Sequence, residues 1–212
     1  YCVRTYMSGA KTLTLKNLTI NAATATNAVY SELDSTRDDG ITLDNVAINA
    51  GGQFGIRFYK SGTRNVSAAN LRLINGTSVI NTKAQGAELN YGIMIEGLAN
   101  SVIIDNSSVT TTYGYGVRLN GAGYLLCNLI ITNGSVITCN GGTAALQVEG
   151  YTTSDITDST FYAADPCTII ACFGNDGYAN SYPLWDTRIK NCTFRWTGSK
   201  GNETLIIGAG VS

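Results

Sequence analysis

The chain has 212 residues, a formal net charge of −1 and only 14% charged residues, against roughly 25% in typical soluble domains. It contains no histidine, which excludes a Ser-His-Asp triad, a Cys-His dyad and any histidine-ligated metal centre. No block of like charge indicates a nucleic-acid surface, and no apolar run is long enough to cross a bilayer. Two prolines and 24 glycines, with abundant Asn, Ser and Thr, predict many short strands and turns.

Seven nine-residue stretches align without gaps when the chain is followed from its first residue. They are TLTLKNLTI (from Thr12), GITLDNVAI (Gly40), NVSAANLRL (Asn65), SVIIDNSSV (Ser101), NLIITNGSV (Asn128), TSDITDSTF (Thr153) and DTRIKNCTF (Asp186). The fourth and ninth positions are apolar, and the sixth is always Asn or Asp: Asn17, Asn45, Asn70, Asn106, Asn133, Asp158 and Asn191. Recurrence of this kind predicts a solenoid with one copy of the stretch per coil.

A shorter unit of alternating inward and outward residues lies between these stretches. Its clearest copies are GIMIEG (from Gly92), GVRLNG (Gly116) and ALQVEG (Ala145), and GIRFYK (Gly55) and AVYSEL (Ala28) are weaker ones. Alternation with period two is typical of a strand with one buried face. Each repeat therefore supplies three strands: this hexad, positions two to four of the nonad, and positions seven to nine.

The predicted fold is all-β, a right-handed single-stranded parallel β-helix of about seven coils. The sixth-position Asn turns the chain between the second and third strands, because Asn tolerates left-handed backbone and bonds its own turn. Stacked at about 4.8 Å per coil, these residues form an Asn ladder, which we expect to be buried.

The motif apolar-x-apolar-x-Asn-x-x-apolar resembles the parallel β-helices of pectate lyases, polygalacturonases and phage tailspikes over nearly the whole chain. The resemblance implies fold rather than activity, because one fold hosts many functions. Polygalacturonases need a Gly-His-Gly segment that is absent here, and Asp38-Asp39 and Arg188-Ile189-Lys190 reproduce only parts of their motifs. In our alignment Ile189 is a core position, with Arg188 and Lys190 pointing outward. No carboxylate cluster for the Ca²⁺ of a pectate lyase is evident, and we expect no metal site and no cofactor.

The chain starts and stops within strand-like segments and shows no cap at either end, although solenoid ends need one. We therefore expect residues 1–212 to be a single β-helix domain that is part of a longer chain, and the alternative is that partner chains cap its ends. The resemblance to tailspikes implies a homotrimer of parallel rods, with other virion tail proteins as partners and a place on a virion surface or outside the cell. Neither a nucleic-acid partner nor membrane insertion is expected.

The six cysteines have no CxxC spacing, so a zinc site is not indicated. We expect free, mostly buried thiols. In the repeat alignment Cys172 takes an inward position of its hexad, and Cys139 and Cys192 do not stack on each other.

The outward residues of the hexad strands form two predicted columns. One contains Arg4, Tyr30, Arg57, Met94, Arg118 and Gln147, and the other contains Tyr6, Glu32, Tyr59, Glu96, Asn120 and Glu149. Aromatic rings stack on sugars, while carboxylate, guanidinium and amide groups bond to hydroxyls. With the long segments Ile74–Tyr91 and Asn175–Trp185 as walls, this face predicts a glycan groove. An ordinary solvated sheet face is the alternative.

Within these columns, the predicted ligand-binding residues are Tyr59, Arg57, Arg118, Gln147 and Tyr30. The predicted acid-base candidates are Glu96, Glu149 and Glu32, since Glu96 lies two coils from each of the others. That gives roughly 9–10 Å between backbones, close to the carboxylate separation of inverting glycosidases.

Three classes of function remain open at this point. The favoured one is a virion receptor-binding or adhesin module, from a phage tail spike or fibre, that holds surface polysaccharide or lipopolysaccharide without cleaving it. The second is a polysaccharide depolymerase of tailspike type, either a glycoside hydrolase or a lyase. The third is a structural or decoration rod with no ligand.

Overall fold

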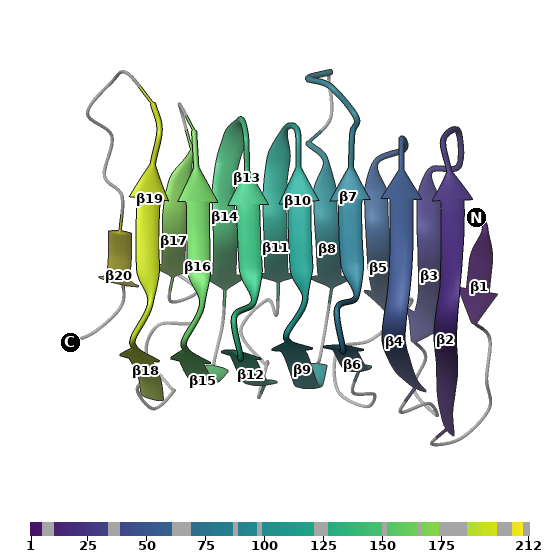
Figure 1. The fold of residues 1–212 in the computed structure, drawn as a ribbon, viewed down its shortest axis with the longest axis horizontal. Coiled ribbons are helices and arrows are strands. Elements are labelled where there is room, and N and C mark those ends of the chain that lie inside the picture. The colour runs from purple at the N-terminus through teal and green to yellow at the C-terminus, as the bar shows by residue number, and fades with distance from the viewer. Residues whose placement is uncertain are drawn as a thin grey trace.

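The computed structural model describes residues 1–5, 11–33, 39–60, 69–86, 89–96, 99–120, 127–149, 152–164, 167–173, 186–198 and 205–209. Every regular element among them is a β-strand, and the strands pair in parallel within two sheets that enclose one apolar core (Figure 1). Among these residues there is no helix that could cross a membrane.

Sheet A contains eight strands that follow one another in chain order, each hydrogen-bonded to the strand one coil away. They lie side by side along the rod, with β1 and β20 at opposite ends (Figure 1). Their bounds are β1 (Val3–Thr5), β3 (Asn27–Leu33), β5 (Phe54–Lys60), β8 (Tyr91–Glu96), β11 (Gly114–Asn120), β14 (Gly142–Glu149), β17 (Thr168–Phe173) and β20 (Leu205–Ala209).

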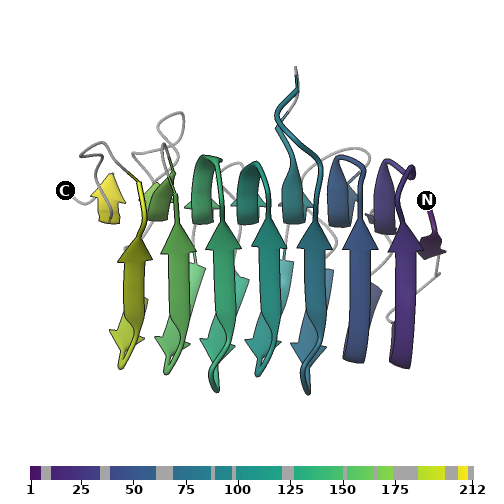
Figure 2. The same cartoon turned by 45° about the horizontal axis from the view of Figure 1, so that its top comes forward.

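Sheet B contains twelve strands in two rows. The second strands of the coils are β6 (Ala69–Ile74), β9 (Ala99–Asp105), β12 (Cys127–Thr132), β15 (Thr152–Thr157) and β18 (Asp186–Lys190). The third strands are β7 (Ser78–Asn81), β10 (Ser108–Thr111), β13 (Val136–Cys139), β16 (Thr160–Ala163) and β19 (Thr193–Trp196). Two long strands, β2 (Lys11–Ala22) and β4 (Asp39–Ala50), belong to both rows and join them (Figure 2).

The predicted all-β parallel solenoid is confirmed, with a difference in its coils. Within the described residues, five coils have the three separate strands expected of each repeat, from β6–β7–β8 to β18–β19–β20. In β2 and β4 the second and third strands are one continuous strand of 12 residues, bent in the middle. The three-strand coil thus recurs five times in this part of the chain rather than seven.

Each bend between the second and third strands contains one Asn or Asp with left-handed backbone. Their φ angles lie between 45° and 56°, at Asn17, Asn45, Asn75, Asn106, Asn133, Asp158 and Asn191. Asn70 was predicted for the third bend, and this prediction is wrong. Asn70 lies in β6, where it pairs with Gly40 and Ser101, and Asn75 takes the bend. The nonad of that coil therefore begins at Asn70, five residues later than predicted.

Two of the bends are longer than the others by one residue. Asn75 is followed by Gly76 (φ 82°) and Asn133 by Gly134 (φ 77°), so two successive residues adopt positive φ. Glycine does this without steric cost. The extra residue in the second of these bends moves the core position from the predicted Val136, which is half-buried, to the fully buried Ile137.

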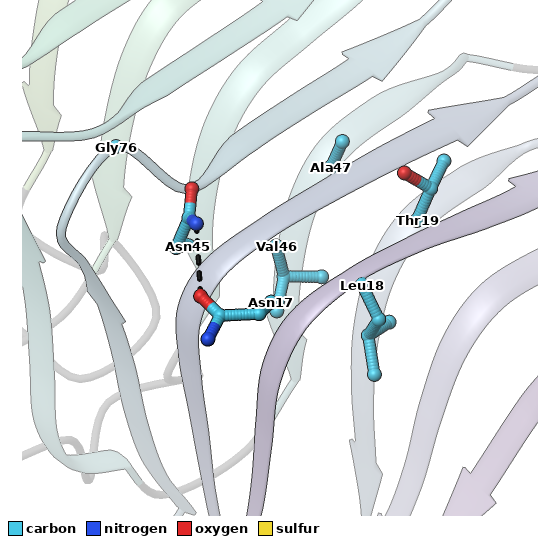
Figure 3. Close-up of a pocket in the computed structure, with 7 residues that line it drawn as sticks. All are labelled: Asn17, Leu18, Thr19, Asn45, Val46, Ala47 and Gly76. Carbon is cyan, nitrogen blue, oxygen red and sulfur yellow. Dashed lines mark hydrogen bonds between the residues drawn. The ribbon is translucent and has the colours of Figure 1, made fainter.

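The ladder side chains connect neighbouring coils through their amides. Asn45 Nδ2 donates to Asn17 Oδ1 at 2.9 Å (Figure 3), and Asn191 Nδ2 donates to Asp158 Oδ1 at 3.1 Å. At the two longer bends the acceptor is not the ladder residue of the preceding coil but the aspartate directly before it in the sequence. Asn133 Nδ2, for example, donates to Asp105 Oδ1 at 2.7 Å.

The expectation that this ladder is buried is wrong, because all seven of its side chains are exposed. At four of the bends, the polar group buried beneath the bend is instead a hydroxyl that follows it, from Thr77, Ser107, Ser135 or Ser159. Thr77 Oγ1 donates to Leu43 O (2.8 Å), and Ser135 Oγ lies 3.0 Å from Ile104 O. A short hydroxyl side chain fits inside the corner and satisfies a backbone acceptor there, which leaves the amide outside.

Asn106→Ala should therefore lower the free energy of unfolding by about 1 kcal/mol. The loss comes from forcing alanine into φ 45°, where a Cβ is disfavoured, and not from an unpaired buried amide. Asn106→Gly should stay within about 0.5 kcal/mol of the parent, since glycine accepts this backbone. Denaturant midpoints measure both values. Equal losses in the two variants would show that the side chain, not the backbone angle, stabilises the bend.

Candidate binding face of sheet A

The first predicted outward column of sheet A is confirmed by the strand pairing. Arg118 has Met94 on one side and Gln147 on the other, and the same row continues through Arg57 and Tyr30 to Arg4. Adjacent strands are about 4.8 Å apart, so each coil adds one side chain to the column at that interval.

The second column is also in register where the structure describes it. Glu32 pairs with Tyr59, and Asn120 pairs with both Glu96 and Glu149. The acid-base candidates are thus two coils apart, as predicted. Tyr6 and the side chain of Glu149 lie outside the described residues.

Two of the candidate carboxylates are engaged in ion pairs with the neighbouring column. Arg57 Nε donates to Glu96 Oε2 at 2.7 Å, Arg57 Nη2 lies 2.7 Å from the same oxygen in an ion pair, and both side chains are half-buried. Arg4 Nη2 donates to Glu32 Oε2 at 2.7 Å. A ligand or substrate that used Oε2 of either carboxylate would compete with the guanidinium for that oxygen.

A third outward column, missed by the sequence analysis, contains Phe54, Tyr91 and Tyr115. Their rings stack on consecutive coils, with centroids 5.0 Å and 5.3 Å apart and interplanar angles of 6° and 2°. All three pack with Met94 in a cluster separate from the solenoid core. Sheet A therefore has an apolar layer on its outer face as well as on its inner face.

The aromatic rings point outward because the next residue of each strand faces the core. A Cβ on Gly55 would lie 2.7 Å from Val79 Cγ1, and one on Gly116 would lie 2.9 Å from Ile137 Cγ2. Only glycine allows the two strands to approach this closely. The available signal was the dipeptide aromatic-Gly, at Phe54, Tyr91 and Tyr115, directly before three of the hexad strands.

The guanidinium groups lie over these rings. Arg57 Cζ is 4.4 Å from the ring centroid of Phe54 and 4.7 Å from that of Tyr59. Arg118 Cζ is 5.0 Å from the Tyr115 centroid, and its Nη1 donates to the Tyr91 hydroxyl at 3.4 Å. Burial raises the pKa of Tyr91, an effect that Arg118 opposes. Cation–π contacts of this kind hold both arginines in fixed positions on the face.

The predicted ligand-binding residues differ in how much surface they offer. Tyr59 is the most accessible of them, with 37% of its surface exposed, and Arg57 and Arg118 are half-buried. Tyr30 and Gln147 are each 6% exposed, so they offer little surface to a ligand. Tyr30 is covered in part by Tyr1, whose ring centroid lies 4.6 Å away.

The predicted wall Ile74–Tyr91 is not one long loop. It contains the bend at Asn75 and strand β7, so the connection to β8 begins only at Thr82. Residues 82–86 project beyond the neighbouring connections (Figure 2), and Asn90 Nδ2 closes the base by donating to Lys83 O and Ala84 O at 3.2 Å and 3.0 Å. The other predicted wall, Asn175–Trp185, lies outside the described residues, as does Asp38.

Other parts of the rod offer less chemistry. Arg188 pairs with Asp155 on the surface while Ile189 packs against the core, which confirms that Arg188 and Lys190 alternate outward. In the described ranges, no three His, Cys, Asp or Glu side chains come together as metal ligands. An open hollow beside the first bends, near Asn17 and Asn45, has no titratable side chain in its lining (Figure 3).

Comparison of the chain with protein-family models, curated proteins and solved structures found no match. The fold and the outward columns of sheet A are therefore the basis of the functional argument.

Proposed function

We propose that the outer face of sheet A, from β5 to β14, binds a linear surface polysaccharide or lipopolysaccharide chain. The observation that carries this proposal is the register of the first two outward columns, in which Arg57 and Arg118 lie on either side of Met94 and the neighbouring column contains Tyr59, Glu96 and Asn120. A linear saccharide along the rod would meet a new row of such groups at every coil, about 4.8 Å apart.

The chemistry of the rows suits a sugar chain. The exposed ring of Tyr59 provides a stacking surface, and planar aromatics are common anchors of this type. Arg57 and Arg118 are fixed over rings, so they direct N–H donors at hydroxyls or carboxylates with little loss of side-chain freedom.

Binding without cleavage is favoured by the ion pair of Glu96. General acid-base catalysis needs a carboxyl group within reach of the proton that it transfers. The Oε2 atom of Glu96 already accepts a hydrogen bond from Arg57 Nε and forms an ion pair with Arg57 Nη2. This geometry supports a receptor-binding or adhesin module over a depolymerase. From the resemblance to tailspikes, we propose that the chain serves in a homotrimeric phage tail spike or fibre, on the virion surface.

A binding assay with purified bacterial lipopolysaccharides and capsular polysaccharides, immobilised as a panel, tests the proposal. The parent chain should bind at least one of them, and Tyr59→Ala should weaken that binding about 3- to 10-fold through loss of ring stacking. Tyr162→Ala is the matched control, because Tyr162 is a half-buried outward tyrosine on sheet B. Its binding should equal that of the parent.

The same panel separates the alternatives. If the parent shortens a polysaccharide and Glu96→Gln binds but no longer shortens it, the chain is a depolymerase. If the parent binds none of the panel, or if both tyrosine variants lose the same affinity, sheet A is not the binding face. If the parent binds none of the panel, a purely structural rod is the remaining function.

A further inference from the structure

Two buried thiols from adjacent coils meet at the end of the third strand. Cys139 is the last residue of β13, and Cys167 directly precedes β17, 28 residues later in the chain. Their Sγ atoms are 3.1 Å apart, and both residues are fully buried.

The backbone around the two cysteines explains why they meet. Cys139 pairs with Ala163 on the next coil, and Ala164 N donates to Cys139 O at 3.0 Å. Cys167 N then donates to Ala164 O at 2.7 Å. Ala164 is thus hydrogen-bonded to both cysteines, and the two sulfurs face each other from neighbouring coils.

A metal ion does not fit between these sulfurs. Two thiolates on one tetrahedral zinc ion, with bonds of about 2.3 Å, lie about 3.8 Å apart. The observed separation is shorter, and no third His, Cys, Asp or Glu joins the pair among the described residues. A covalent S–S bond requires the atoms to approach by only about 1 Å more.

We propose that Cys139 and Cys167 form a disulfide that links adjacent coils when the chain folds in the presence of a small disulfide oxidant. The thiolate of Cys139 attacks one sulfur of oxidised glutathione, and one glutathione thiolate leaves. The deprotonated Cys167 then attacks Cys139 Sγ and expels the second glutathione. The two protein thiols lose two electrons and two protons, and the oxidant becomes two glutathione thiols.

In the folded coils Cys139 is surrounded by hydrogen-bonding groups. A hydrogen bond with Cys167 lowers the pKa of the Cys139 thiol, backbone hydrogen bonds add to this effect, and burial opposes it. Its Sγ lies 3.1 Å from Gly141 O and 3.3 Å from Gly114 O. Because the folded coils bury both sulfurs, the exchange occurs while these coils form or open locally.

Cell-free synthesis of the full chain in a glutathione redox buffer tests the link, because the oxidant is then present as the coils form. Alkylation under denaturing conditions should find four free thiols of the six, with a mass loss of 2 Da relative to chain made in reductant. Cleavage after Glu149 separates Cys139 from Cys167 in the sequence, so fragmentation of the linked peptides identifies the pair.

Cys167→Ala should abolish the link, and Cys192→Ala should retain it, since the hydrogen bonds of Cys192 Sγ go to the backbone carbonyls of Ile156 and Lys190. The oxidised parent should unfold with an equilibrium constant two to three orders of magnitude below that of the reduced parent, the effect expected for a closed loop of this length. Cys167→Ala should show no such difference. Six free thiols after synthesis in oxidised glutathione, or a link between other cysteines, would overturn the proposal. The result does not depend on glycan binding.

Discussion

Gly92→Ala is expected to destabilise the rod by about 3 kcal/mol, a large effect for the addition of one methyl group. A Cβ at this position would lie 2.4 Å from Val109 Cγ1 and 2.6 Å from Gly116 O. The second contact is the more severe, because Gly116 belongs to β11, which pairs with the strands of both neighbouring coils. Moving that carbonyl would disturb two ladders at once, so relaxation cannot remove the clash cheaply.

Gly86→Ala is the matched control for this variant. Gly86 is an exposed glycine in the connection before β8, and no atom lies within 4 Å of the position where its Cβ would be. Its replacement should change stability by less than about 0.5 kcal/mol. Urea unfolding followed by circular dichroism measures both variants. A Gly92→Ala midpoint equal to that of Gly86→Ala would mean that the coils are less closely packed than the structure shows.

Phe161→Ala is expected to cost about 3–5 kcal/mol, the usual loss when a buried aromatic ring leaves a cavity. Phe161 is fully buried in β16, with Ile137 beside it on one coil and Phe194 on the next. Its ring stacks on that of Phe194, with centroids 5.6 Å apart. No flexible side chain fills this column, so the cavity would persist.

Tyr162→Ala tests the same strand from the other side. Tyr162 points outward, is half-buried and has Arg195 over its ring, 5.9 Å from the centroid. Its loss should cost less than about 1 kcal/mol. Hydrogen exchange should show reduced protection in β13, β16 and β19 for Phe161→Ala, because each coil contacts only its neighbours. Similar exchange in the two variants would contradict the assignment of Phe161 to the core.

The class of fold and the two polar columns were predictable from the sequence because alternation with period two fixes which residues share a face. One outward column contains Arg57, Met94 and Arg118 on adjacent strands, because each of them directly follows an inward Ile or Val of its hexad. The frame of the third coil was not predictable by a gapless alignment. The bend at Asn75-Gly76 is one residue longer than most of the others. An alignment that gives every nonad the same length therefore assigned Asn70 to this bend.

The contacts that were missed depend on distances that no repeat pattern encodes. Only the close approach of Val79 to Gly55 shows why Phe54 must point outward. Likewise, Cys139 and Cys167 occupy unrelated positions in the repeat. They meet because Ala164 is hydrogen-bonded both to Cys139 of the preceding coil and to Cys167 of its own coil.

The long strands β2 and β4 also bear on how quickly the rod assembles. They share the longest continuous pairing among the described strands, Lys11–Ala22 beside Asp39–Ala50, and the following coils pair over shorter stretches. Closing the loop of a nucleating pair of coils costs entropy before any contact is gained, whereas each coil added afterwards pairs with an edge that already exists. We therefore expect β2 and β4 to form the folding nucleus.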